Sequence, residues 1–424
     1  MSRHEGLFRP WSLRELVTEL TTRRTTPDAA AARARRRIEA TDGELRAWVV
    51  QAEALDLTTS GPLGGVPLAV KDIIDLAGLP TRCGSPLRAD APPATADAAI
   101  VRAWRAAGAV PIGKTVTTEF AYFHPGPTHN PAAPGHTPGG SSSGSAAAVA
   151  SGQVPLALGS QTAGSVTRPA SFCGIAALVM SRGRFPVTGV TGFSPGLDSH
   201  GVFAATASDV ALAWSALTGE PEAAPRPPRL LLWSGEKQAE VAPALRDGLS
   251  AVADRMRAAG AVVDAFPGES LVAQVAAAHP VVMAYEAARE RAAELAQADR
   301  LSSPLATLLR TGAATPDADY EAARLVVAAA ESDVVAWTAE YDAVIGPATP
   351  GPAPEGMAAT GDPVLSRGWQ ALGLPVVTVP GLRDERGLPL GLQLVGRDRG
   401  ETALLAAARW AEDVVCGTTA VVTR

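Results

Sequence analysis

One long stretch without charged residues constrains the fold of this chain more than any other feature of its sequence. From Phe120 to Thr167 there are 48 consecutive residues with no Asp, Glu, Lys or Arg. Gly, Pro, Ser and Gln interrupt the stretch, so it is not a run of about 18 apolar residues of the kind that crosses a membrane. Because charged side chains are rarely buried, we interpret this stretch as part of a protein interior.

The composition favours a soluble protein with a large core. The chain has 424 residues, 46% of them hydrophobic, and its net charge of −6 gives no electrostatic footprint for nucleic acid. Three distant cysteines, Cys83, Cys173 and Cys416, argue against a disulfide framework and for a reducing compartment. The polar segment from Met1 to Val17 lacks the apolar core of a signal peptide. We therefore expect a cytoplasmic protein without a nucleic-acid or membrane partner.

Apolar runs of strand length alternate with helical patterns along the chain. Ser12 and Glu15 form a capping box at the start of the first helix. Strands are expected at 66–70, 109–112, 154–158, 230–233, 343–345, 376–379 and 390–395. Further helices are expected at 28–48, 97–107, 145–151, 280–298, 318–339 and 402–414. This alternation is typical of an α/β protein with a buried sheet.

A phosphate-loop pattern, G-x4-G-K-T, spans Gly108 to Thr115. A working phosphate loop follows a strand, opens a helix and aims successive backbone N–H groups at phosphate. Here a helical pattern precedes Gly108, the following residues are typical of a strand, and Pro111 has no N–H. We expect a helix, a turn and a strand that ends on an exposed Lys114.

The run Gly140 to Gly144 matches G-x-S-x-G, the nucleophile elbow of α/β-hydrolases, with Ser142 at its centre. That elbow needs a strand running directly into the turn, and the proline-rich residues 131–138 cannot form a central strand. Only His200 and His279 follow as candidate triad histidines. An esterase that uses Ser142 stays an alternative.

Two other patterns indicate little chemistry. Ser234 and Lys237 match S-x-x-K, but no partner motif of the penicillin-binding class accompanies them. A second group is formed by three nearby histidines: His124, His129 and His136. Their spacing fits no helix face, and no carboxylate or cysteine lies in the same stretch to complete a metal site, so we expect no metal.

Lysine is scarce in this chain, since only Lys71, Lys114 and Lys237 of the 37 basic residues are lysines. Lys71 stands at the end of an apolar strand pattern. Arginine stays protonated in proteins, whereas a desolvated lysine can lose its proton and act as a base. The alternative is a structural ion pair between Lys71 and Asp72 or Asp75.

Two clusters of small polar residues favour the first interpretation. Gly139 to Ser145 is a tight turn that leads into a small-residue helix, and Gly159 to Ser165 follows a strand and ends on a hydroxyl. Small residues before Ser165 leave room for a carbonyl to approach backbone N–H groups, as an oxyanion hole requires. Together with a sequestered lysine and no usable histidine, these clusters indicate a serine activated by a lysine.

These blocks resemble those of the amidase signature family. The similarity is carried by five segments: 64–75, 113–120 (GKTVTTEF), 138–148 (PGGSSSGSAAA), 158–174 (LGSQTAGSVTRPASFCG) and 387–396 (GLPLGLQLVG). The resemblance implies a single large α/β domain over 1–424, with a central mixed β-sheet flanked by helices. We divide it into a core at about 60–205, a helical, substrate-shaping middle at about 218–340, and a C-terminal sheet and helix at about 341–424.

The resemblance also implies roles for the residues singled out above. Ser165 corresponds to the nucleophile, Ser141 to a bridging serine that follows a cis peptide bond, and Lys71 to the base. Tyr122 is expected as a pocket wall and Ser142 as a support of the proton relay. The implied oxyanion hole consists of three backbone N–H groups, those of Thr162, Ala163 and Gly164. Trp369 is a further candidate for the pocket.

The implied activity is hydrolysis of the C–N bond of a small linear amide, with no metal or organic cofactor and with a homodimer left open. An acyltransferase or an amidotransferase subunit on the same fold is the alternative. The chain departs from the family pattern at Ala163, where glycine is usual, at Thr167, where arginine is usual, at Val179-Met180 and at Gly196. If position 163 needs a positive φ, its methyl group costs about 1–2 kcal/mol. We expect these departures to affect substrate preference.

Overall fold

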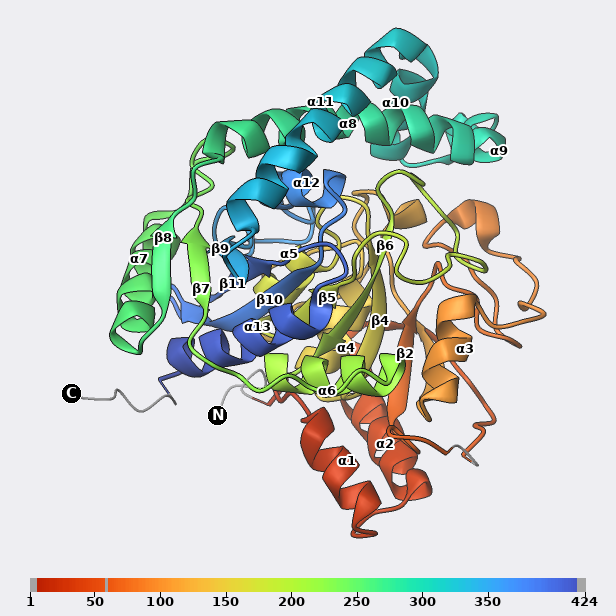
Figure 1. Ribbon diagram of the computed structural model, residues 1–424. Coiled ribbons are helices and arrows are strands. Elements are labelled where there is room, and N and C mark those ends of the chain that lie inside the picture. The colour runs from red at the N-terminus through yellow and green to blue at the C-terminus, as the bar shows by residue number, and fades with distance from the viewer. Residues whose placement is uncertain (1–5, 58–59, 418–424) are drawn as a thin grey trace.

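The computed structural model describes residues 6–57 and 60–417. Its 11 strands form one sheet in the order β1-β3-β2-β4-β6-β5-β10-β11-β9-β7-β8, with helices packed around it (Figure 1). In chain order the strands are β1 (Trp48–Gln51), β2 (Pro67–Lys71), β3 (Val110–Thr115), β4 (Leu156–Gln161), β5 (Ala176–Val179), β6 (Ser199–Ala204), β7 (Arg229–Leu232), β8 (Val262–Ala265), β9 (Ala343–Pro347), β10 (Val376–Arg383) and β11 (Pro389–Val395). The helices are α1 (Leu13–Thr21), α2 (Pro27–Leu45), α3 (Ala99–Ala106), α4 (Ser143–Ala150), α5 (Thr167–Cys173), α6 (Ala207–Thr218), α7 (Pro243–Ala258), α8 (Glu269–Glu290), α9 (Ala292–Leu295), α10 (Ser303–Ala314), α11 (Asp317–Thr338), α12 (Val364–Ala371) and α13 (Glu401–Val415), with short 3₁₀ turns η1 (Pro86–Arg88), η2 (Glu119–Ala121) and η3 (Ala298–Arg300).

The sheet contains strand pairs of both directions. β2 runs parallel to its neighbours β3 and β4, and β7 runs parallel to β8 and β9. The pairs that join β4 to β9 through β6, β5, β10 and β11 are all antiparallel, as is the pair of β1 with β3. The sheet is therefore mixed, and the predicted α/β fold with a central mixed sheet flanked by helices is confirmed.

The uncharged stretch 120–167 contains a helix that packs tightly against the sheet. All eight residues of α4 are buried, and Gly144 makes the close approach possible. A Cβ atom at this position would lie 2.3 Å from the carbonyl oxygen of Ala47 and 2.4 Å from the nitrogen of Val116. Ser145 Oγ donates a hydrogen bond to the carbonyl oxygen of Leu158 at 2.7 Å. Small residues thus allow α4 to pack closely on β2, β3 and β4.

Segment 218–340 supplies helices and also part of the sheet. β7 and β8 form one edge of the sheet, while α8, α10 and α11 pack together beyond one end of the strands (Figure 1). Among the described residues, α8 is the one helix that is long and apolar enough to cross a membrane, and half of the window that meets this criterion is buried inside the protein. It packs against α10, α11 and α12. The division of the chain into three segments stays a prediction.

Pro280 lies inside a helix and does not start one, which corrects the expected helix at 280–298. α8 begins at Glu269 and continues through Pro280 to Glu290. Proline has no N–H, so the helix lacks the hydrogen bond from this position to the carbonyl group four residues earlier. Buried residues on both sides, such as Val272 and Val282, stabilise the helix by packing, and this packing overrides the local preference.

Lys114 is fully buried, so the expectation of an exposed side chain is wrong. Its Nζ lies 3.0 Å from Asp72 Oδ1, and both side chains are shielded completely from solvent. Nζ also donates a hydrogen bond to Thr81 Oγ1 at 3.0 Å. Asp72 is therefore the ion-pair partner of Lys114. The alternative expectation, that Asp72 pairs with Lys71, is wrong.

The Lys114→Met variant is expected to lose about 3 kcal/mol of unfolding free energy, because Asp72 would remain buried without its partner. The unfolding midpoint in urea, followed by circular dichroism, measures this loss. Arg310→Ala is a matched control, because Arg310 pairs with Asp299 at 2.9 Å on the surface and such pairs contribute about 0–1 kcal/mol. Equal midpoint shifts in the two variants would contradict the prediction.

Candidate active site

Lys71 ends the buried strand β2, which lies between β3 and β4 in the sheet. Its side chain is fully buried, and Nζ donates hydrogen bonds to Ser141 Oγ at 2.7 Å and to Ser160 Oγ at 2.8 Å. No carboxylate in the described part of the chain forms an ion pair with it. Burial lowers the pKa of Lys71 from 10.5 to about 7, although the carboxylate of Asp198 acts in the opposite direction. A large fraction of this amine is therefore neutral near pH 7.

Ser141 follows a cis peptide bond, Gly140–Ser141, in the loop that leads to α4. Its side chain is buried, and its carbonyl oxygen accepts a hydrogen bond from the backbone N–H of Thr118 at 3.2 Å. Its hydroxyl lies against Lys71 Nζ. The bridging serine expected from the family resemblance thus has the lysine as its direct neighbour.

Ser165 lies in the turn between β4 and α5 and is 7% exposed. The side chain of Gln161 closes this turn, since its Oε1 accepts hydrogen bonds from the backbone N–H groups of Val166 and Thr167 at 2.9 and 3.0 Å. The carbonyl oxygen of Ser165 accepts a hydrogen bond from the N–H of Ser142 at 3.3 Å. This contact joins the two serine clusters and brings Ser165 beside the loop that carries the Lys71 contact.

The three residues expected to form the oxyanion hole lie directly before Ser165. The backbone N–H groups of Ala163 and Gly164 donate no hydrogen bond to another described residue, so they are available to a substrate oxygen. The carbonyl oxygen of Thr162 accepts a hydrogen bond from His279 Nε2 at 2.8 Å. Ala163 is not among the residues with positive φ, so the conditional cost of its methyl group does not arise.

Two residues of this region were not identified from the sequence, Ser160 and Asp198. Ser160 is the second hydroxyl in contact with Lys71. Asp198 accepts hydrogen bonds from Thr162 Oγ1 at 2.5 Å and from the N–H of Phe193 at 2.7 Å, and burial raises its pKa. Asp198 thereby holds the turn before the nucleophile. Ser160 lies within a quoted motif, whereas nothing in the local sequence indicates that Asp198 reaches Thr162.

The supporting residues expected around the site have different positions. Ser142 Oγ is buried and donates to the carbonyl oxygen of Ser160 at 3.3 Å, so it supports the turn and is not presented to solvent. Tyr122 is half-buried, and its ring stacks on that of Phe193 with ring centroids 5.6 Å apart. Trp369 is fully buried and packs against Trp233 with ring centroids 5.3 Å apart. Trp369 is therefore part of the core, which corrects its expected place in the pocket.

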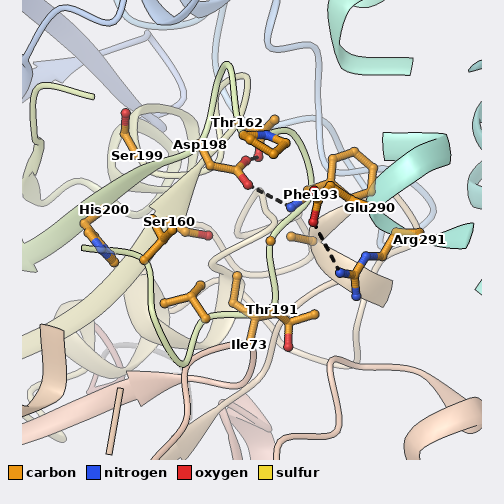
Figure 2. Close-up of a pocket in the computed structure, with 15 residues that line it drawn as sticks. Ile73, Ser160, Thr162, Thr191, Phe193, Asp198, Ser199, His200, Glu290 and Arg291 are labelled. Carbon is orange, nitrogen blue, oxygen red and sulfur yellow. Dashed lines mark hydrogen bonds and ion pairs between the residues drawn. The ribbon is translucent and has the colours of Figure 1, made fainter. Parts of the chain in front are cut away.

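A cavity of about 230 Å³ adjoins the turn before Ser165. Figure 2 shows Ser160, Thr162 and Asp198 on one of its sides, with Glu290 and Arg291 coming from the segment around α8 and α9. Lys71, Ser141 and Ser165 do not line it. Of the residues that contact Lys71 or lie in the turn before Ser165, Ser160 and Thr162 line the cavity. Within the described chain, no group of three His, Cys, Asp or Glu side chains could hold a metal ion.

Comparisons with known proteins identify the family. The family model described as Amidase matches residues 36–405. AtzE of Pseudomonas sp. (strain ADP), which belongs to a 1-carboxybiuret hydrolase, is 31% identical over 94% of this chain and 97% of its own length. A glutamyl-tRNA(Gln) amidotransferase chain of Rhodopirellula baltica is 32% identical over 84% and 85% of the two chains. A crystal structure described as that of an amidase has a TM-score of 0.85 at 29% identity, over 95% of this chain and 99% of the other.

The mixed α/β sheet, with a buried lysine at the end of β2 and the Ser165 turn after the neighbouring strand β4, matches the fold of a solved amidase. The chain belongs to the amidase signature family, because the family model covers most of its length and the quoted sequence blocks are those of the family. The resemblance noted in the sequence is therefore confirmed.

Proposed function

We propose that this protein hydrolyses a carboxylic amide to an acid and ammonia or an amine, through an acyl-enzyme on Ser165. The observation that carries the proposal is the contact of a fully buried lysine, Lys71, with Ser141 Oγ at 2.7 Å. A lysine with a pKa of about 7 is matched to general-base catalysis near neutral pH. The location of Ser165 beside the Ser141 loop supports its assignment as the nucleophile.

In the proposed reaction, protons pass between Ser165, Ser141 and Lys71. Neutral Lys71 accepts the proton of the Ser141 hydroxyl, and Ser141 accepts the proton of Ser165, whose oxygen attacks the amide carbonyl carbon. The backbone N–H groups of Ala163 and Gly164 stabilise the negative oxygen that develops. The proton returns through the relay to the leaving nitrogen, and the C–N bond breaks. Water, deprotonated along the same path, releases the carboxylic acid and restores Ser165.

Labelling with a fluorophosphonate probe tests this proposal. The intact mass of the wild-type protein is expected to rise by one adduct, and peptide mapping is expected to place the adduct on Ser165. The same treatment of the Ser165→Ala variant serves as the control. An adduct on Ser142 would contradict the proposal and favour the α/β-hydrolase type of elbow.

Acyl or ammonia transfer is the second candidate function. It is favoured by the 32% identity to a chain of a glutamyl-tRNA(Gln) amidotransferase. Hydroxylamine added during turnover distinguishes the two candidates, because a transferase would form a hydroxamate faster than the free acid. Co-purification from the native host would detect a partner protein. A cytoplasmic location and a homodimer stay predictions, which cell fractionation and light scattering of the purified protein would test.

A further inference from the structure

Arg168 is a buried guanidinium beside the candidate nucleophile. It is the second residue of α5, and its backbone N–H donates to the carbonyl oxygen of Gly164 at 3.0 Å, which places it one turn beyond Ser165. Its side chain is 3% exposed. One nitrogen, Nη2, donates to the carbonyl oxygen of Gly140 at 2.5 Å and to Thr360 Oγ1 at 3.3 Å. Arg168 therefore touches the same loop that carries Ser141.

The other side of this guanidinium has no partner. Nε and Nη1 of Arg168 are buried and donate to no atom of the described residues. No carboxylate of the described chain forms an ion pair with Arg168. The nearby carboxylate of Asp362 is instead 3.7 Å from Arg367 Nη2 and accepts a hydrogen bond from the N–H of Val364 at 2.9 Å. Burial lowers the pKa of Arg168 to about 9, so the group is still charged at neutral pH.

A purely structural role does not require this residue type. Supporting the carbonyl oxygen of Gly140 needs one N–H donor, which a neutral amide could provide. A buried and unpaired positive charge is costly to the fold, and two further donors are left unsatisfied. A planar fork of N–H groups fits the two oxygens of a carboxylate. The two unsatisfied donors of Arg168 are therefore suited to an anion.

A second guanidinium, that of Arg367 in α12, lies near enough to Arg168 to influence its charge. Pro363 precedes this helix and packs on the turn before the nucleophile, because a Cβ at Gly164 would lie 2.8 Å from Pro363 Cβ. The side chain of Arg367 is 25% exposed, and its Nε is buried without an acceptor. Its charge acts on Arg168 and on Tyr122. Arg367 is thus a second basic residue near Arg168, although its Nη2 also lies 3.7 Å from the carboxylate of Asp362.

We propose that Arg168, assisted by Arg367, binds a carboxylate carried by the amide substrate, so that the enzyme selects anionic amides. This inference rests on the proposed function. The Phe123 ring centroid lies 5.6 Å from the guanidinium carbon of Arg168, and the Cβ position of Gly361 is 3.3 Å from Arg168 Cδ. Both groups cover the guanidinium from solvent, which strengthens its electrostatic interaction with a bound carboxylate.

Matched pairs of amides test the proposal. Succinamate and butyramide differ by a carboxylate in place of a methyl group on the acyl side, and N-acetyl-β-alanine and N-propylacetamide differ in the same way on the amine side. In at least one pair, the wild-type kcat/KM is expected to be at least about tenfold higher for the anion. Arg168→Gln is expected to lower the rate for that anion by about 30- to 100-fold and the rate for its neutral partner by less than about threefold.

Two controls separate binding from folding and from general effects of charge. Arg246→Gln removes an exposed arginine from α7 and is expected to leave both rates unchanged. Arg367→Gln is the second test variant, with an expected loss for the anion of about tenfold, and it is used alone if Arg168→Gln does not fold. Calorimetric titration of the Ser165→Ala protein with the preferred anion measures binding without turnover, and the Arg168→Gln change is expected to weaken this binding by a similar factor.

The possible failures are distinguishable. If the fluorophosphonate labels Ser165 but neither pair of amides shows a preference that depends on Arg168, the carboxylate site is wrong and the proposed function stands. Equal losses for the anionic and neutral amides in Arg168→Gln would show that the residue only supports the Gly140 carbonyl group. If Ser165 is not labelled, the proposed function fails and the inference fails with it.

Discussion

The Ser165→Ala variant is expected to hydrolyse amides about 10⁴- to 10⁶-fold more slowly than the wild type, the range found when a serine nucleophile is removed from a hydrolase. Only the hydroxyl is lost, so the fold should persist. The backbone hydrogen bond from Ser142 N–H to the carbonyl oxygen of residue 165, 3.3 Å in the wild type, does not involve the side chain that is changed. Initial rates of ammonia release, with melting curves for both proteins, measure the effect.

Ser151→Ala is the matched control for this prediction. Ser151 is also a buried serine, but its Oγ donates to the carbonyl oxygen of Ala148 at the end of α4, away from the relay. Its loss is expected to change the rate by less than about twofold and the stability by about 1 kcal/mol. A Ser165→Ala protein that keeps even a hundredth of the wild-type rate would contradict the assignment of the nucleophile.

Lys71→Met is expected to lower the rate of amide hydrolysis by a similarly large factor, because no other base among the described residues donates to or accepts from Ser141 Oγ. In the wild type, kcat/KM is expected to rise with pH around an apparent pKa near 7, the value to which burial lowers the pKa of Lys71. Measurement of the pH–rate profile between about pH 5 and 9 tests this. Lys71→Arg keeps the length and the charge but cannot deprotonate, so activity in this variant would overturn the assignment.

The same lysine makes a prediction about stability. The pKa of Lys71 is lower in the folded protein, about 7, than its ordinary value of 10.5, so between these values the unfolded chain binds more protons. Unfolding free energy therefore rises with pH across this window, by up to about 1.4 kcal/mol per pH unit from this group. Lys71→Met removes that contribution, so its stability should depend less on pH between 7 and 10.5. Parallel urea titrations of the two proteins at several pH values measure the difference.

Local sequence patterns predict the long or strongly apolar elements of this fold. β2 was expected because its apolar run is continuous, and α11 was expected from its helical periodicity. β6 was missed, since Ser199 and His200 make it polar although every one of its residues is buried. The sequence predicts a helix that begins only at Pro280, because proline normally starts or breaks a helix, whereas α8 begins at Glu269 and the packing of its neighbours overrides this preference. Such outcomes depend on contacts that the local sequence does not contain.

The sequence indicates those residues of the candidate site that stand out in composition or in their immediate neighbours. Lys71 was found because lysine is rare and because a strand precedes it, and Ser141 and Ser165 were found because they lie in glycine-rich clusters. Arg168 lies inside the segment 158–174, but the local sequence does not distinguish it, because only the fold leaves two of its donors without acceptors. The contact of His279 with the carbonyl oxygen of Thr162 joins residues 117 positions apart, which no local pattern can indicate. Lys114 was misplaced for the same reason, since its partner Asp72 is on a different segment.

The parallel pairing of β2 and β4 has a consequence for how such an enzyme can change. Val70 is in register with Leu158, so the strand that ends on Lys71 and the strand that leads to the Ser165 turn are held at the spacing of adjacent strands, about 4.8 Å. That spacing is a property of backbone hydrogen bonding and is independent of side-chain identity. Mutations in the helices beyond the sheet, such as α8 and α10, can therefore alter which amide is accepted without moving these two strands relative to each other. In this architecture, chemistry and selectivity are free to evolve separately.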